Sequence, residues 1–140
     1  MEAIFAESPA SAAPVSNRRR VASVAMSALP VLFLSFDGVI KLAKIDPVVE
    51  AMQRLGYPDA AARPLGVVLL VCVATYIVPR TAALGAVLLT AYLGGAIATH
   101  VRVEDPLFSH TLFPTYVAAF IWAGLYLRDA RVRALAPWNR

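Results

Sequence analysis

The sequence has very few of the residues that proteins use to hold a redox cofactor or a metal ion. Cys72 is the only cysteine in 140 residues, so the chain can form no internal disulfide, CxxC redox pair or haem-attachment motif. It lies within an apolar run, where a free cysteine behaves as a small hydrophobic residue. His100 and His110 have a spacing that matches no metal motif. The sequence therefore predicts no metal site, and without a nucleophile motif it favours a protein that is not an enzyme on its own.

Charged residues are also scarce, at 16% of the chain, whereas hydrophobic residues make up 59%. The mean hydropathy is +0.66, and ordinary soluble domains are only about 45–50% apolar. A soluble domain of this length could not hide so much apolar surface, because small domains bury proportionately little of their chain. The composition predicts a single domain whose solvent is the lipid bilayer.

Four apolar segments approach the roughly 20 residues that a membrane helix requires. The second becomes long enough when the alanines before it are added, and the turn Pro79-Arg80 makes the second and third segments antiparallel neighbours. The sequence thus predicts an all-α integral membrane four-helix bundle over residues 18–133, between a disordered N-terminal tail (1–17) and a short C-terminal tail (134–140). The four spans run from about Val21 to Ile40, Pro64 to Val78, Thr81 to Thr99 and Leu112 to Leu127.

A short amphipathic helix is predicted between the first two spans. Asp46 is expected to cap it, with Pro47 at its first position and Gly56 at its end. Its apolar residues repeat at helical spacing, which favours a helix on the membrane surface or across the end of the bundle. These residues are Val48, Met52 and Leu55.

Basic residues flank the apolar spans, a pattern that sets membrane orientation and does not indicate a nucleic-acid partner. The two tails and the Pro79-Arg80 turn hold eight of the 13 lysines and arginines, and the other two loops hold five. Since positive residues stay in the cytoplasm, both termini are expected there.

The third span carries small residues four apart, which allow helices to approach closely. These pairs are Ala91 with Gly95 and Gly94 with Ala98. Two interpretations are open: close packing within one chain, or the face of a homo-oligomer.

Polar residues gather where the first and third spans end. Odd-numbered spans run in the same direction, so both ends emerge on the same side of the membrane. The residues are Asp37, Lys41, His100, Arg102 and Asp105. We expect them to form one polar pocket at a membrane interface.

Two interpretations of Asp37 are open. A carboxylate within a span is costly unless it faces the bundle interior, where it marks a candidate functional site. Asp37 and Lys41 are four residues apart and can instead form a structural ion pair, with Lys41 extending toward the interface. A proton relay between His100 and Asp37 is chemically reasonable, since histidine titrates near neutrality.

Three short motifs, in this order and spacing, resemble the DoxX-like membrane protein family. They are FDGVIKL at 36–42, LGYP at 55–58, and ATHVR at 98–102 with Asp105-Pro106. The resemblance covers about Val31 to Leu127 and implies a four-helix protein of the bacterial inner membrane. Some relatives in the broader family are subunits of quinone-linked sulfur oxidation or partners of redox enzymes. A membrane or redox protein is therefore the partner that the resemblance implies.

The first functional hypothesis is an accessory or quinone-interacting subunit of a redox-linked membrane system. A quinone site needs an apolar slot and a few donors to the carbonyl oxygens, which Lys41, His100 and Arg102 could supply. Quinone is the one cofactor that this hypothesis indicates. The alternatives are a structural membrane assembly factor and a small oligomeric transporter that uses Asp37 as its coupling site.

Overall fold

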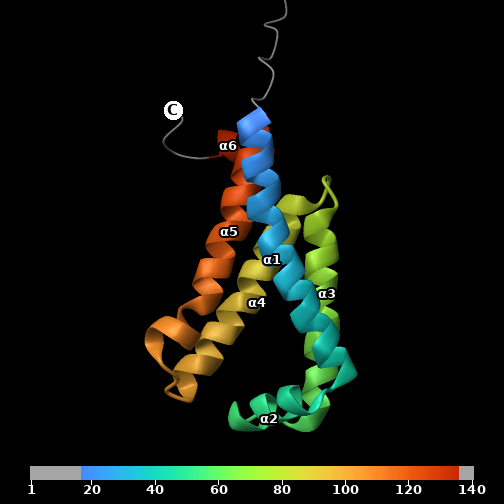
Figure 1. Cartoon of the computed structure of the whole chain (residues 1–140), viewed down its shortest axis with the longest axis vertical. Coiled ribbons are helices and arrows are strands. Elements are labelled where there is room, and N and C mark those ends of the chain that lie inside the picture. The colour runs from blue at the N-terminus through green and yellow to red at the C-terminus, as the bar shows by residue number, and fades with distance from the viewer. Residues whose placement is uncertain (1–16, 136–140) are drawn as a thin grey trace, which may run out of the picture.

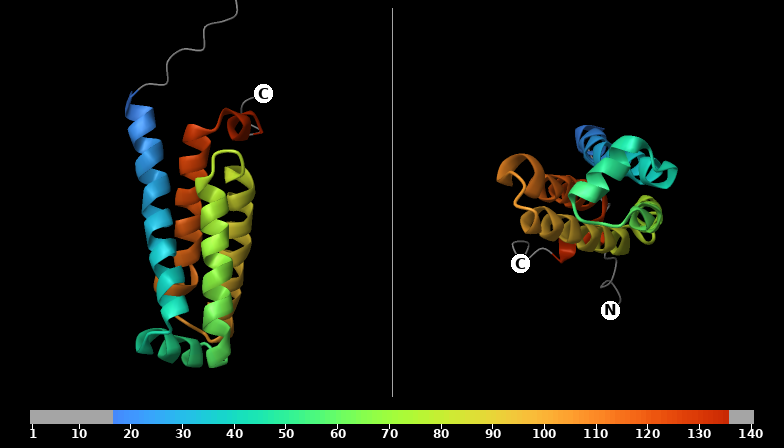
Figure 2. Two further views of the ribbon diagram at one scale, coloured as in Figure 1. Left: turned by 90° about the vertical axis from the view of Figure 1, so that its right-hand side faces the viewer. Right: turned by 90° about the horizontal axis from the view of Figure 1, so that it is seen from below.

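The computed structural model describes residues 17–135, which fold into helices with no β-strand among them. Helices α1, α3, α4 and α5 lie side by side, while α2 and α6 lie across opposite ends of the bundle (Figures 1 and 2). The predicted all-α class is confirmed. In chain order the elements are α1 (Asn17–Ala43), α2 (Asp46–Arg54), η1 (Asp59–Ala61), α3 (Ala62–Ile77), α4 (Ala82–Arg102), the π-helical turn η2 (Leu107–Thr111), α5 (Phe113–Arg128) and α6 (Ala130–Ala134).

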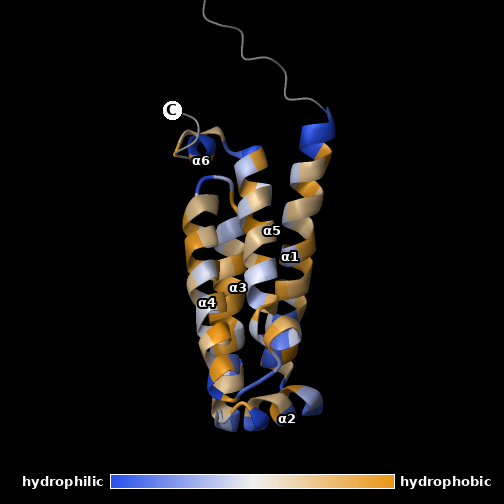
Figure 3. Ribbon diagram, turned by 90° about the vertical axis from the view of Figure 1, so that its left-hand side faces the viewer, coloured by the Kyte–Doolittle hydropathy of each residue, from blue (hydrophilic) through white to orange (hydrophobic). Residues whose placement is uncertain are grey.

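The surface of the bundle is that of a membrane protein. Helices α1 and α4 and the continuous η1–α3 segment are long and apolar enough to cross a bilayer. Large apolar side chains on their outer faces are exposed, among them Leu32 at 70% and Val71 at 56%. Figure 3 shows apolar residues along the middle of the helices and polar residues at the two ends. Helix α5 is shorter, with 16 residues.

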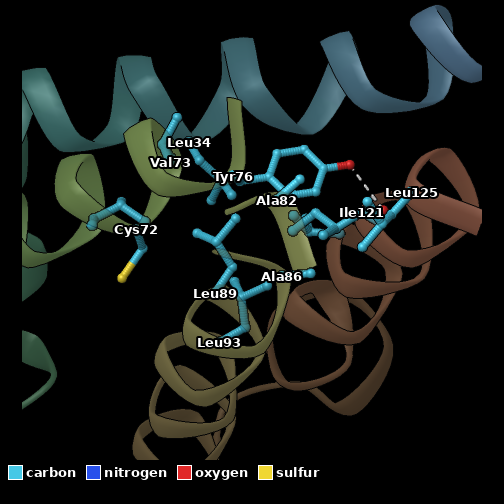
Figure 4. Close-up of a cluster of buried hydrophobic side chains, with 12 residues drawn as sticks. Leu34, Cys72, Val73, Tyr76, Ala82, Ala86, Leu89, Leu93, Ile121 and Leu125 are labelled. Carbon is cyan, nitrogen blue, oxygen red and sulfur yellow. Dashed lines mark hydrogen bonds between the residues drawn. The ribbon is translucent and has the colours of Figure 1, made fainter. Parts of the chain in front are cut away.

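The main core lies where all four long helices meet (Figure 4). Tyr76 is fully buried there, and its hydroxyl donates a hydrogen bond to the carbonyl oxygen of Ile121 at 2.9 Å. The same hydroxyl lies 3.1 Å from Ser27 Oγ, so it links α3 to both α1 and α5. A second, smaller cluster joins α2 to the start of α3 and consists of Val48, Met52 and Ala62.

Glycines allow the closest helix approaches. A Cβ atom on Gly85 would lie 2.3 Å from the backbone nitrogen of Tyr76, and one on Gly124 would lie 2.4 Å from Ser27 Oγ. A Cβ atom on Gly94 or Gly95, by contrast, would meet nothing within 4 Å. The interpretation that these two glycines bring α4 close to another helix is therefore wrong for the part of the chain that the structure describes. Gly95 instead lines a cavity.

Two predicted boundaries need correction. The first helix begins at Asn17 and includes the arginines at 18–20, because a membrane helix can continue past the hydrocarbon where its side chains reach water. Asp46 is the first residue of α2 and not its cap: Ile45 precedes the helix, without a side-chain capping bond. Pro47 is therefore the second helical residue and not the first. Of the two predicted tails, residues 1–16 and 136–140 lie outside the described residues, and Ala134 belongs to α6.

Candidate functional site

A cavity of about 380 Å³ lies between the two hydrophobic clusters. Its walls belong on one side to the main core and on the other to the cluster under α2. The main core contributes Leu34, Leu93 and Val117, and the second cluster contributes Met52, Tyr57 and Leu65. The cavity thus begins where the main core ends. Helix α2 and the connection between α2 and α3 form its other side.

The helix arrangement explains why the space is there. Helices α1 and α3 stay in contact toward the α2 end, where a Cβ atom on Gly66 would lie 2.8 Å from the carbonyl oxygen of Gly38. Helices α4 and α5 diverge from that pair toward the same end (Figure 1). No glycine holds α4 against α1 or α3 there, since Gly95 lines the cavity itself.

Asp37 and Lys41 lie together on the wall that α1 provides. Lys41 Nζ donates a hydrogen bond to Asp37 Oδ1, and both residues line the cavity. The predicted pairing is confirmed. The two side chains are only 28% and 17% exposed, so the pair is largely removed from solvent. Partial burial strengthens the attraction between the charges, because fewer water molecules screen it.

His100 lies on the same cavity, near the end of α4, and is held by Asp105. Its Nδ1 atom lies 2.6 Å from Asp105 Oδ2. The chain turns back sharply to allow this, with Glu104 in the left-handed region (φ 56°) and the Asp105 amide donating to the carbonyl oxygen of His100. The hydrogen bond from His100 lowers the pKa of the Asp105 carboxyl below its usual value. Asp105 itself does not line the cavity.

Arg102 does not join the polar pocket in which the sequence predicted it. Its guanidinium donates to the carbonyl oxygen of Leu55 and lies 5.7 Å from the centre of the Tyr57 ring. Arg102 is therefore not among the cavity-lining residues. It ties the end of α4 to the connection after α2 and supports the wall from outside.

Three further polar residues on the cavity were missed in the sequence. The Tyr57 hydroxyl lies 2.8 Å from Thr99 Oγ1, and both residues line the cavity. This contact joins the α2–α3 connection to α4. Tyr92 also lines the cavity, and the described residues offer its hydroxyl no hydrogen-bond partner. A signal was present: Tyr92 and Thr99 are seven residues apart on one helix, so they share a face with the neighbouring His100.

The described residues contain no group of three metal-ligating side chains close enough to hold an ion. The rings of His100 and His110 are 6.0 Å apart, and His110 instead contacts Ser109. The cavity combines a mainly apolar wall with an ion pair, a histidine held by a carboxylate, and the hydroxyl of Tyr92, which has no hydrogen-bond partner within residues 17–135.

Comparison with known proteins gave one match. Neither the curated proteins nor the solved structures include a match to the chain. The model of the DoxX-like family matches residues 25–124, a range that contains every residue lining the cavity. The match covers more than half of the 140 residues and agrees with the resemblance of the three motifs. The chain is a small helical membrane protein that belongs to the DoxX-like family.

Proposed function

We propose that this protein is an accessory subunit of a redox-linked system in the bacterial inner membrane and that its cavity binds a quinone. The observation that carries the proposal is the composition of the cavity wall. Phe33, Leu34 and Phe113 provide apolar surface, and the polar groups lie among them and not on the outside of the bundle. Ligand sites are typically apolar clefts of about 300–1,000 Å³ with a few placed polar groups.

Two side chains suit the oxygens of a quinone head. The Tyr92 hydroxyl has no acceptor among the described residues and could donate to a quinone carbonyl. His100 keeps its Nδ1 on Asp105, which leaves Nε2 for a ligand. A neutral ring would accept a hydrogen bond from a quinol hydroxyl at Nε2, and a protonated ring would donate to a quinone carbonyl. The electron donor or acceptor would belong to the partner protein.

We infer that α5 is the fourth membrane span and that the chain crosses the bilayer four times. Helix α5 is short for a span, but η2 precedes it with only Leu112 between them, and the two together cover 107–128. Helix α5 also packs along α1 and α4, which are both long enough to cross. Both described termini then lie on one side of the membrane. The arginines on that side favour the cytoplasm.

A transporter that uses Asp37 as its coupling site has less support. Transport sites usually lie near the middle of the bilayer, whereas Asp37 lies in the last two turns of α1 and already has Lys41 as its counter-ion. A structural assembly factor would need no ligand in the cavity. The experiment below therefore separates the quinone proposal from the assembly proposal.

The test is the amount of quinone that co-purifies. Protein extracted from native membranes in mild detergent is treated with organic solvent, and quinone is quantified per chain. We expect a near-stoichiometric amount with the wild type. The double variant Tyr92→Phe/His100→Gln should lower it about tenfold or more, because two hydrogen bonds of about 0.5–1.5 kcal/mol each are lost. Tyr116→Phe, an exposed tyrosine outside the cavity, is the matched control.

Wild-type protein with only the background amount of quinone would overturn the proposal and leave the assembly factor. An equal amount in the double variant would show that any bound quinone lies elsewhere. Circular dichroism of each variant establishes that the helices are intact.

A further inference from the structure

The opposite end of the bundle, where α6 lies, carries a second arrangement of polar groups with no role in the cavity described above. Among the described residues this end has seven arginines and a single acidic residue, Asp129. Figure 3 shows the polar segments at the start of α1 and in α6. The seven are Arg18, Arg19, Arg20, Arg80, Arg128, Arg131 and Arg133.

These arginines differ in what they contact. Arg133 donates hydrogen bonds to the carbonyl oxygens of Tyr126 and Leu127 and so caps the C-terminal end of α5. Arg128 lies 4.6 Å above the centre of the Tyr76 ring and donates one hydrogen bond to the Tyr76 carbonyl oxygen at 3.0 Å. A guanidinium has five N–H donors, so Arg128 keeps donors for a ligand.

Arg80 and Arg131 have no side-chain hydrogen bond or ion pair with any residue in the described range 17–135. Together with Arg128 they line one cavity of about 370 Å³ between the α3–α4 turn and α6. Asp129 lines it too, but its Oδ1 accepts a hydrogen bond from the Arg131 amide and so caps the start of α6. Three arginines thus line one space together with a single described carboxylate, of which one oxygen accepts a backbone amide.

A second cavity, of about 230 Å³, adjoins the first through Arg128. It lies along α1 and is mainly apolar, with two serine hydroxyls among its lining residues. These residues include Val24, Ala28, Val31 and Ile77 beside Ser23 and Ser27. One ligand could therefore place an anionic group between the arginines and an apolar chain along α1.

We propose that this end of the bundle binds one acidic phospholipid, whose phosphodiester lies between Arg80, Arg128 and Arg131 and whose acyl chain follows the groove along α1. Arginine binds phosphate in a bidentate manner that a lysine cannot reproduce. Basic pockets between membrane helices on the cytoplasmic side are typical sites for anionic lipid head groups. The geometry is independent of the quinone cavity, which lies at the other end of the chain's long helices.

The experiment counts bound lipid by native mass spectrometry of the full-length protein in a zwitterionic detergent. Three probes are titrated separately: a phosphatidylglycerol, a phosphatidylcholine with the same acyl chains, and inorganic phosphate as a competitor. We expect one phosphatidylglycerol to bind per chain in preference to phosphatidylcholine. Inorganic phosphate at equal concentration should not displace it, since phosphate lacks the chain that occupies the groove.

The decisive variant is Arg80→Gln/Arg131→Gln, because neither side chain has a described contact whose loss could unfold the protein. It should weaken phosphatidylglycerol binding about 25-fold, since each basic residue near an anionic membrane surface contributes about a fivefold factor. Arg54→Gln, an exposed arginine at the α2 end, removes a positive charge elsewhere and should leave binding unchanged.

Three results would overturn the proposal. Equal binding of phosphatidylglycerol and phosphatidylcholine would show that the arginines do not select the head group. Displacement by inorganic phosphate at equal concentration would identify a site for free phosphate instead of lipid. A similar loss in Arg54→Gln and in the double variant would show that overall charge, and not this cavity, controls binding.

Discussion

At the end of the bundle where the described termini lie, the helices are held together by close contacts, and at the opposite end they separate around a cavity. Gly85 lies against the backbone of Tyr76 at the first end, and Gly124 lies against Ser27. The connections there are short, with only the turn at 78–81 between α3 and α4. At the other end α1 and α3 are joined by a long connection that contains α2. Loop length and glycine position thus decide at which end α4 and α5 can separate from α1 and α3.

The two ends also differ in charge. The terminal end has seven arginines and one acidic residue, whereas the cavity end has five basic and six acidic residues among those described. A uniform positive charge suits a membrane surface that carries anionic lipids. A balanced set of charges suits internal pairs, and two such pairs are formed, Lys41 with Asp37 and His100 with Asp105. One end is therefore suited to the lipid surface and the other to a site within the protein.

The largest expected effect concerns which side of the membrane each end of the bundle faces. A reporter that is active only in the periplasm, fused after Arg140, should give no signal, because the arginine-rich end is expected in the cytoplasm. The same reporter inserted after Glu104, in the loop at the cavity end, should be active and serves as the control. A strong signal from the Arg140 fusion would reverse the orientation without changing the helix bundle.

The second prediction breaks the close packing at the terminal end. Gly85→Ala should lower the free energy of unfolding by about 2–3 kcal/mol, since the new methyl group would overlap the Tyr76 backbone and the helices must shift apart. Gly94→Ala on the same helix meets open space and should leave stability unchanged or raise it by less than about 1 kcal/mol. Unfolding in a denaturing detergent, followed by circular dichroism, measures both. Equal losses would show that the helices do not meet at Gly85.

The third prediction concerns the ion pair at the cavity end. Asp37→Ala should cost about 1–2 kcal/mol by leaving Lys41 unpaired. This is less than for a fully buried pair, because the two side chains are 28% and 17% exposed and water screens them. The double variant Asp37→Leu/Lys41→Met should recover much of the loss, since apolar residues often replace buried pairs. If the double variant folds as the wild type does but co-purifies with less quinone than the wild type, the pair belongs to the proposed ligand site.

The fourth prediction compares the same substitution, tyrosine to phenylalanine, at the two ends of the bundle. Tyr76→Phe should lower the free energy of unfolding by about 1 kcal/mol, since it removes a fully buried hydroxyl that contacts Ile121 and Ser27. Tyr57→Phe removes a half-buried hydroxyl with Thr99 as its partner and should cost about half as much. Thermal unfolding in one detergent compares the two. A larger loss for Tyr57→Phe would place the more important contact at the cavity end.

The sequence predicted what depends on local spacing. The pair of Asp37 and Lys41 follows from one helical turn, and the burial of Val48 and Met52 follows from the period of α2. Contacts between helices were not accessible in the same way, because they depend on how each helix is rotated and inclined. Gly85 and Gly94 are alike in the sequence, yet one lies against a backbone and the other faces open space.

The same limit applies to the candidate site. His100 was placed at the correct end of the bundle because odd-numbered spans end on one side, and it does line the cavity. Arg102, two residues later, points to Leu55 instead, since a step of two residues moves a side chain to the other side of a helix. Tyr92 was missed because a tyrosine within an apolar run is also typical of packing.

The smallest expected effect is the pH dependence of the contact between His100 and Asp105. The hydrogen bond from His100 lowers the pKa of Asp105 in the folded protein, so the folded state favours the ionised carboxylate. The contact therefore stabilises the fold above the usual carboxyl pKa of 3.8 and loses this effect as the pH falls through the lowered value. We expect Asp105→Asn to unfold at a lower temperature than the wild type from pH 7 to about pH 5, with the difference shrinking below about pH 4. Glu104→Gln removes an exposed neighbouring charge and should show no such trend. A difference between wild type and Asp105→Asn that persists unchanged at pH 3 would mean that the ionised carboxylate is not what holds His100.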